Sequence, residues 1–206
     1  MAIEQRRSRP RALFAWAVLG MACATLDDAD VHTTGSIRTT GDGMAEAVRR
    51  WRDQATPEER AVIDELMARK DLQIHVVLVV GRLSKASRGG ESMLASNSES
   101  GRLCIWHPKA QGVPPGRDWE VFYDPERAKE YEEKYGIPTP VEVVLQHEIF
   151  GHIVLLLKKP QPLQEGKIDK KFLDTSERQA LDVENRYRQR FGLQEVPPEL
   201  EGFSPP

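Results

Sequence analysis

The most informative segment of the chain is LQHEIFGH, residues 145–152. It lies inside a long apolar run that begins at Thr139-Pro140, and this pattern predicts a helix that is buried on nearly every side. Titratable side chains are costly to bury in such a helix unless they are paired or bind a metal ion. His147, Glu148 and His152 therefore indicate a site with a chemical role rather than ordinary packing positions.

The two histidines of this segment lie at positions i and i+5, whereas the common zinc-binding helix motif HExxH places them at i and i+4. On a regular α-helix, a step of five residues ends about 140° beyond a full turn, so the two rings would face different sides. A π-bulge, which adds one residue to a turn, would realign them, and such bulges occur at functional sites. Gly151 lies in the interval and tolerates local backbone strain. We therefore predict a π-bulge at Ile149–Gly151.

HEIFGH is similar to the HExxxH motif, HELLGH, of the dipeptidyl-peptidase III family of zincin metallopeptidases. The layout of strands, motif helix and Glu-bearing helix resembles gluzincin-type metallopeptidases and the small metallopeptidase domains of secreted bacterial toxins and effectors. The resemblance implies an α+β, zincin-like fold, in which a small β-sheet packs on a buried active-site helix that a Glu-bearing helix follows. Its sharp part is six residues long, and the chain is far shorter than dipeptidyl-peptidase III, so release of dipeptides does not follow.

The resemblance also implies one Zn²⁺ ion, with His147 and His152 as ligands and a third ligand from a Glu on the following helix. A catalytic zinc site has three protein ligands and one open position. Glu177 and Glu184 are seven residues apart, so they share one face of that helix. SERQA, residues 176–180, resembles the EECRA stretch that holds the third ligand in dipeptidyl-peptidase III, and this favours Glu177. Glu184 is the alternative, and the glutamate that is not a ligand would hold the tautomer of a ligand histidine.

The function that the resemblance implies is hydrolysis of peptide bonds in a peptide or protein substrate, with Glu148 as the general base toward a metal-activated water. The candidate donors to the developing oxyanion are Tyr187, Arg188, His107 and Tyr123. An extended peptide could add to the edge of the sheet, for which Arg102–Trp106 is the predicted strand. Two other functions are a catalytically inactive zincin-like interaction module of the cell envelope and a toxin-type effector protease. Glu148 favours an enzyme over a module, because binding alone needs no general base.

The N-terminus has the pattern of an export signal. Four arginines precede an apolar stretch, Ala12–Ala24, that ends in Ala22-Cys23-Ala24, so residues 1–24 are predicted to be a signal peptide. The stretch is shorter than the about 20 residues that span a bilayer. An exported protein is expected, either periplasmic, envelope-anchored or secreted, and a lipidated Cys23 or the N-terminus itself would allow membrane association. Residues 25–43 are polar and aperiodic and are predicted to be a linker.

Residues 44–206 remain as one predicted metallopeptidase domain, and their composition is that of a folded protein. The whole chain of 206 residues is 39 % hydrophobic and 30 % charged, and its net charge of −3 argues against nucleic-acid binding. Helical spacing covers 44–69, where Thr56 and Glu59 form a capping box. Further predictions are strands over 72–80, 102–106 and 119–123, a loop or weak hairpin over 81–100, and helices over 125–135 and 175–191.

Overall fold

The computed structural model describes residues 31–80, 93–95, 102–106, 117–158 and 170–201. The predicted signal peptide, His107 and most of the predicted loop over 81–100 lie outside these residues. The helices and strands are, in chain order, β1 (Val31–Thr34), β2 (Ile37–Thr40), α1 (Met44–Gln54), α2 (Pro57–Ala68), β3 (Gln73–Leu78), β4 (Met93–Ala95), β5 (Arg102–Trp106), β6 (Asp118–Tyr123), α4 (Pro125–Tyr135), α5 (Val141–Leu145), η3 (Gln146–Ile153), α6 (Val154–Lys158), α8 (Lys170–Arg190) and η4 (Pro198–Glu201).

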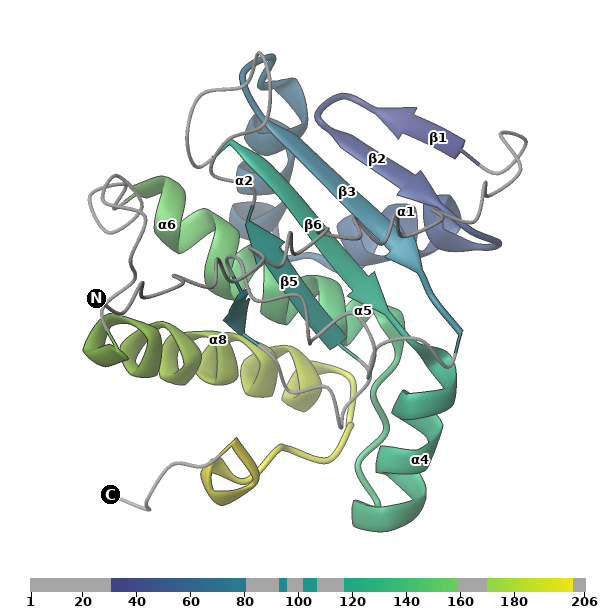
Figure 1. Cartoon of the computed structure of the whole chain (residues 1–206), viewed down its shortest axis with the longest axis vertical. Helices are drawn as coiled ribbons and strands as arrows, with labels where there is room; N and C mark the ends of the chain where they lie inside the picture. Colours follow the sequence, from purple (N-terminus) through teal and green to yellow (C-terminus); the bar gives the residue numbers. More distant parts are fainter. Residues whose placement is uncertain (1–30, 81–92, 96–101, 107–116, 159–169, 202–206) are drawn as a thin grey trace, which may run out of the picture.

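The fold is α+β, and its centre is a mixed sheet. Within the described residues the sheet has six strands in the order β1-β2-β3-β6-β5-β4 (Figure 1). β2, β3 and β6 run parallel to one another, and antiparallel strands flank them on both sides. The strands predicted around β3, β5 and β6 are confirmed. β5 lies between β6 and β4, so the prediction that Arg102–Trp106 forms the edge is wrong, and β4 is the outer strand on that side.

The predicted linker over 25–43 is wrong from residue 31 onward, because residues 31–40 form the β1–β2 hairpin of the sheet. The hairpin turns at Gly35, whose φ is +62° and where a Cβ would lie 2.0 Å from the Met67 carbonyl oxygen. Ser36 fastens this turn to the end of α2, since its hydroxyl donates to the Leu66 carbonyl at 2.7 Å. Hairpin strands at an edge need few apolar side chains, and Ile37 alone supplies the apolar contact of this one to the core.

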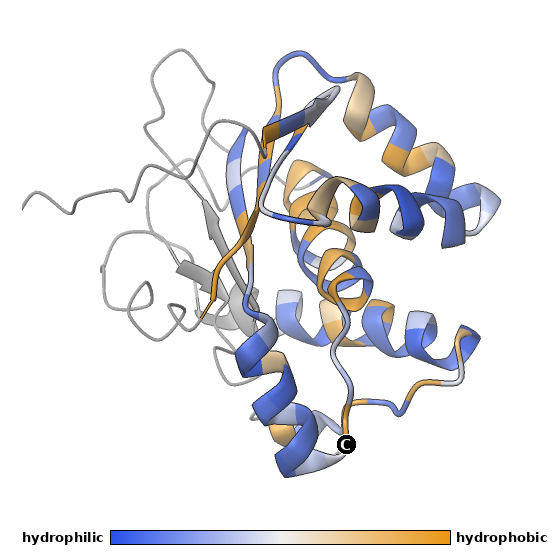
Figure 2. Cartoon of the chain, turned by 90° about the vertical axis from the view of Figure 1, so that its right-hand side faces the viewer, coloured by the Kyte–Doolittle hydropathy of each residue, from blue (hydrophilic) through white to orange (hydrophobic). Residues whose placement is uncertain are grey.

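Helices α1 and α2 connect β2 to β3 and pack against one face of the sheet, as Figure 2 shows from the side. The predicted capping box at the start of α2 is confirmed. The Thr56 hydroxyl accepts from the Glu59 backbone N–H, and the Glu59 carboxylate accepts from the Thr56 N–H at 2.9 Å. Pro57 follows as the first helical residue, where its missing N–H costs nothing.

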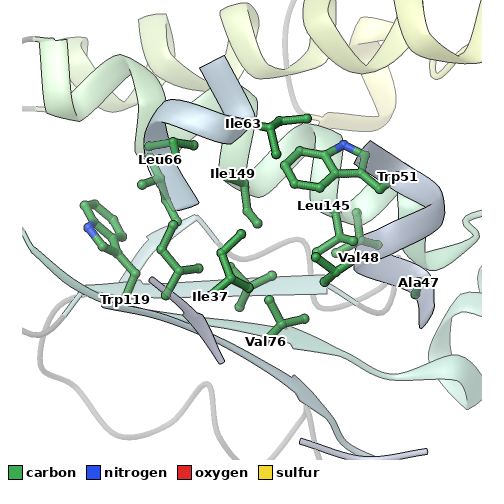
Figure 3. Packing of buried hydrophobic residues seen from close by; sticks show 14 of the residues in the cluster. Ile37, Ala47, Val48, Trp51, Ile63, Leu66, Val76, Trp119, Leu145 and Ile149 are labelled. Carbon is green, nitrogen blue, oxygen red and sulfur yellow. The ribbon is translucent and has the colours of Figure 1, made fainter. Parts of the chain in front are cut away.

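We call the continuous helix α5–η3–α6, residues 141–158, the motif helix. It packs on the same face of the sheet as α1 and α2, and its apolar side chains complete the main core (Figure 3). Ile37, Ile74 and Trp119 are register partners across β2, β3 and β6, and all three are buried under the helices. Ile149 of the motif helix reaches this core, so the segment that carries the histidines is anchored by apolar packing.

Helix α8 lies alongside the motif helix (Figure 1). It confirms the helix predicted over 175–191 but begins at Lys170, about one turn earlier than predicted. A second, smaller core joins α8 to α4 and to the chain after α8, through Tyr131, Ile137, Leu181 and Val196. Among the described helices there is none with the length and apolar character needed to cross a bilayer.

Candidate metal centre

The predicted π-bulge is confirmed, since Gln146–Ile153 is a π-helix between the α-helical segments α5 and α6. At its end, the Val154 N–H donates to the Ile149 carbonyl, five residues earlier, which is the hydrogen bond of a π-turn. The wider turn places residues i and i+5 on one side of the helix. His147 and His152 therefore face the same space, although a regular α-helix would separate them.

The two imidazole rings converge edge to face inside the protein. Their centroids are 5.0 Å apart, their planes meet at 67°, and the two Nε2 atoms are 3.2 Å apart. His147, Glu148 and His152 are each 1 % exposed. The approach of two ring nitrogens at this distance, away from water, requires a proton or a cation between them, because two lone pairs repel each other.

Glu177 of α8 supplies a third atom to this meeting point. Its Oε2 lies 3.5 Å from His147 Nε2 and also 3.5 Å from His152 Nε2, which is long for a hydrogen bond to either ring. Ligand atoms at about 2.0–2.2 Å from a tetrahedral zinc ion lie about 3.3–3.5 Å from one another. The triangle of two nitrogens and one oxygen has the dimensions of three zinc ligands.

The far nitrogen of each ring faces a partner on α8. His147 Nδ1 lies 2.8 Å from Glu184 Oε2, and His152 Nδ1 lies 2.8 Å from the Ser176 hydroxyl oxygen. A carboxylate accepts hydrogen bonds only, so in a neutral His147 ring Nδ1 carries the proton and Nε2 keeps its lone pair. The Ser176 hydroxyl oxygen can accept a hydrogen bond from His152 Nδ1–H in the same way. Both rings can therefore direct an unprotonated Nε2 at one ion.

Glu148 lies next to this triangle, with its Oε2 4.0 Å from His152 Nε2. Among the described residues, His147, Glu148 and His152 form a group that could hold a metal ion, since their ligand-type atoms all lie within 4.8 Å of one another. Glu177 is 22 % exposed and is the member of the centre that reaches furthest toward solvent. The structure thus brings together the three predicted motif residues, His147, Glu148 and His152, and Glu177, the preferred third ligand.

The charges at the centre favour a cation. Burial opposes ionisation of Glu177, but its interactions with His147 and His152 outweigh burial and hold its pKa well below the usual range. Glu148 and Glu184 are further buried carboxylates around the two rings, and Arg188 contributes one positive charge through Glu184. With these groups ionised, three carboxylates and one guanidinium leave two negative charges, which a divalent ion would balance.

The motif helix and α8 can approach this closely because Gly151 has no side chain. A Cβ at Gly151 would lie 2.4 Å from the Ala180 Cβ and 2.5 Å from the Ala180 Cα. The sequence suggested that Gly151 is needed because it tolerates backbone strain. The structure shows instead that a side chain at this position would clash with Ala180. One face of α8 presents residues at every fourth position, and all four are buried: Ser176, Ala180, Glu184 and Arg188.

The three predicted oxyanion donors that the structure describes have other partners or packing positions. Tyr187 packs in the main core and donates to Gln54 of α1, and Arg188 is bonded to Glu184 and to backbone carbonyls. Tyr123 also packs against the main core, where burial raises the pKa of its hydroxyl to about 12. His107 lies outside the described residues. The sequence placed the two tyrosines only by their helix or strand, and this does not determine which way a ring points.

Two residues of this region were missed by sequence reasoning. Ser176 was noted only as a neighbour of Glu177, although its spacing of four and eight residues from Ala180 and Glu184 places it on the same helix face. Gln146 was passed over beside the motif, yet a buried amide in an apolar helix signals a hydrogen-bond network. It accepts from Trp51 Nε1 at 2.8 Å and donates to Glu59 at 3.0 Å.

Comparison with known proteins found no relative of this chain. No family model matches the sequence, and searches of curated proteins and of solved structures gave no match. The site therefore has to be interpreted from its own geometry.

Proposed function

We propose that this protein is a zinc-dependent peptidase with a zincin-like fold, in which His147, His152 and Glu177 hold one Zn²⁺ ion. The observation that carries the proposal is the triangle of His147 Nε2, His152 Nε2 and Glu177 Oε2, with sides of 3.2, 3.5 and 3.5 Å. Two histidines and a glutamate are a ligand set of catalytic zinc sites, which keep a fourth position open. The small sheet beside a buried motif helix and the following Glu-bearing α8 support the same proposal.

Zinc in such a site supplies Lewis-acid chemistry, since it lowers the pKa of water and polarises the carbonyl group of a peptide bond. Glu148 accepts a proton from the attacking water and delivers it to the nitrogen of the leaving amine. Glu184 and Ser176 accept hydrogen bonds from the Nδ1–H groups of His147 and His152 and so keep the two rings in orientation. Burial of the centre excludes bulk water, which strengthens these electrostatic interactions.

A metal-binding module without catalysis is the second candidate. The observation in its favour is burial, because His147, Glu148 and His152 are each 1 % exposed and a substrate must reach Glu148. The presence of a carboxylate 4.0 Å from His152 Nε2 favours the enzyme, since a module needs no general base there. We propose export to the periplasm, envelope or exterior on the N-terminal pattern, which precedes the described residues.

The experiment that tests the proposal combines zinc content with cleavage of a peptide library by the purified protein. We expect one zinc per chain and cleavage that Glu148→Gln reduces by about 10²–10⁴-fold while zinc is retained. Glu142→Gln is the matched control, since Glu142 is on the same motif helix but pairs with Arg50. Absence of zinc from the wild type would reject the proposal. Zinc without cleavage would support the module, and undiminished cleavage by Glu148→Gln would remove Glu148 from the mechanism.

A further inference from the structure

Arg188 is a buried guanidinium that lies behind the metal centre. Both Arg188 and Glu184 are 0 % exposed, and they are one turn apart on α8. Arg188 Nε donates to Glu184 Oε1 at 2.7 Å, while the other oxygen of Glu184 lies 2.8 Å from His147 Nδ1. The three side chains thus form an unbroken line from the guanidinium, through the carboxylate, to the ring whose opposite nitrogen faces the centre.

The same guanidinium also donates hydrogen bonds to two backbone carbonyls, one before the motif helix and one after α8. Arg188 Nη1 donates to the Pro138 carbonyl at 2.6 Å and to the Gln194 carbonyl at 3.2 Å. Pro138 lies just before the motif helix, and Gln194 lies just after α8. The position of Arg188 is therefore set relative to the start of the motif helix, and through it the position of the Glu184 carboxylate is set as well.

The two histidines are supported unequally. His147 is backed by the Glu184–Arg188 ion pair, whereas His152 is backed by the neutral hydroxyl of Ser176. A fully buried ion pair is weak evidence for stability, because its desolvation cost is large and apolar replacements of such pairs are often neutral or stabilising. A role in holding a metal ligand gives this pair a function that stability alone does not.

We propose that Arg188 is a positioning residue of the metal centre, which holds the Glu184 carboxylate so that His147 keeps its Nε2 directed at the ion and binds it more tightly than His152 does. The inference rests on the proposed zinc site. Arg188 does not touch the ion or the substrate, and it acts through Glu184 and His147. Ser176 cannot supply the same support to His152, since a hydroxyl brings no negative charge to the ring.

The test compares zinc affinity by chelator competition in the wild type and in four variants of the full protein. Arg188→Met is expected to weaken zinc binding about 10–100-fold. Because that variant leaves Glu184 buried without its partner, a second variant, Glu184→Gln/Arg188→Met, removes both charges together and keeps the volume. We expect the double variant to fold and still to show the same loss of zinc affinity.

Arg190→Met is the matched control, because Arg190 is two residues further along α8 and pairs with Glu59 of α2, away from the centre. It should leave the zinc affinity of the folded protein unchanged. Arg188→Lys keeps the charge without the planar fork and should recover part of the affinity. The visible spectrum of the cobalt-substituted protein should shift in Arg188→Met and stay constant in Arg190→Met, since it reports the ligand field.

Two results would overturn the inference while the proposed function survives. One is wild-type zinc affinity in folded Arg188→Met or in the double variant, and the other is an equal loss of affinity in Arg190→Met, which would indicate general loosening of α8. Failure of the proposed function is recognised separately and earlier, because in that case the wild-type protein itself binds no zinc.

Discussion

Two polar networks meet at the motif helix, and they differ in the kinds of atoms that face one another. In the anchoring network (Trp51, Gln146, Glu59 and Arg190), each hydrogen bond has a donor facing an acceptor. In the metal-centre network (His147, His152, Glu177, Glu184 and Ser176), the outer atoms are paired in the same way. Its inner atoms, two Nε2 nitrogens and one carboxylate oxygen, face one another instead. This difference is what we expect between a network that supports the fold and one that, as proposed above, holds an ion.

In the anchoring network, the charge of the Glu59 carboxylate is also stabilised by its hydrogen-bond partners. Burial opposes ionisation of Glu59, but hydrogen bonds from Arg190, from the Thr56 backbone and from Gln146 outweigh it and lower the pKa of this carboxyl. Changes in the anchoring network should therefore alter the stability of the protein and leave metal binding alone. Changes in the metal-centre network should lower the affinity for metal, and the predictions that follow test this contrast.

The largest expected effect is the loss of zinc in Glu177→Ala. In the proposed centre Glu177 supplies a ligand atom and Glu184 supports His147 from behind, so Glu177→Ala should weaken zinc binding by more than about 100-fold and Glu184→Ala by about 10–100-fold. The measurement is zinc retention against a chelator, on both variants in parallel. If Glu184→Ala loses zinc and Glu177→Ala keeps it, the assignment of the third ligand is reversed.

The parts of this centre that could be predicted from sequence are those in which a local spacing has one structural solution. Two histidines at i and i+5 in a buried helix can converge only if the turn is widened, and the π-helix over Gln146–Ile153 is what the structure contains. The position of Glu177 and Glu184 on one face was predictable from their separation of seven residues. Which of them faces the inner atoms was not, because it depends on how α8 is rotated against the motif helix.

The parts that could not be predicted depend on contacts between distant segments. Residues 31–40 were expected to belong to a linker, because they are mostly polar and lack an apolar alternation, and Ile37 is the hairpin residue that packs in the main core. The anchoring network joins Gln146 to Trp51 and Glu59, which are 95 and 87 residues away in sequence. No local pattern reveals such partners.

The next effect in size concerns Gly151, which sets the spacing between the motif helix and α8. A Cβ there would lie 2.4 and 2.5 Å from atoms of Ala180, one of them backbone, so α8 must move for Gly151→Ala to fit. Overpacking costs about 1–3 kcal/mol in the free energy of unfolding. Because the Cβ would contact a backbone atom, we expect Gly151→Ala to lose about 3 kcal/mol. Because α8 carries Glu177, zinc affinity should fall as well, and thermal unfolding with chelator competition measures both losses.

Gly151→Ala/Ala180→Gly is the control for this prediction, since it removes the nearer of the two clashing atoms. The double variant should recover part of the stability and part of the zinc affinity. If Gly151→Ala lowers stability while zinc affinity stays at the wild-type value, the spacing between the motif helix and α8 does not control zinc binding at the centre.

The smallest effect is expected for Gln146→Met, which removes the centre of the anchoring network one residue before His147. The change keeps the volume but leaves the Trp51 N–H without its acceptor, and a buried group left unsatisfied costs about 1–3 kcal/mol. We expect a loss of about 2 kcal/mol in the free energy of unfolding, measured in urea, with wild-type zinc affinity. Proximity in sequence to His147 makes this the strictest test of the contrast.

Trp51→Phe in the Gln146→Met background removes the orphaned donor together with its acceptor. The two changes should therefore cost less in combination than the sum of their separate effects, and the difference is the coupling free energy of the Trp51–Gln146 hydrogen bond. Strict additivity would show that Gln146 supports the fold through other contacts. A fall in zinc affinity with Gln146→Met alone would instead show that the anchoring network also holds the π-turn open, so that the two networks act as one.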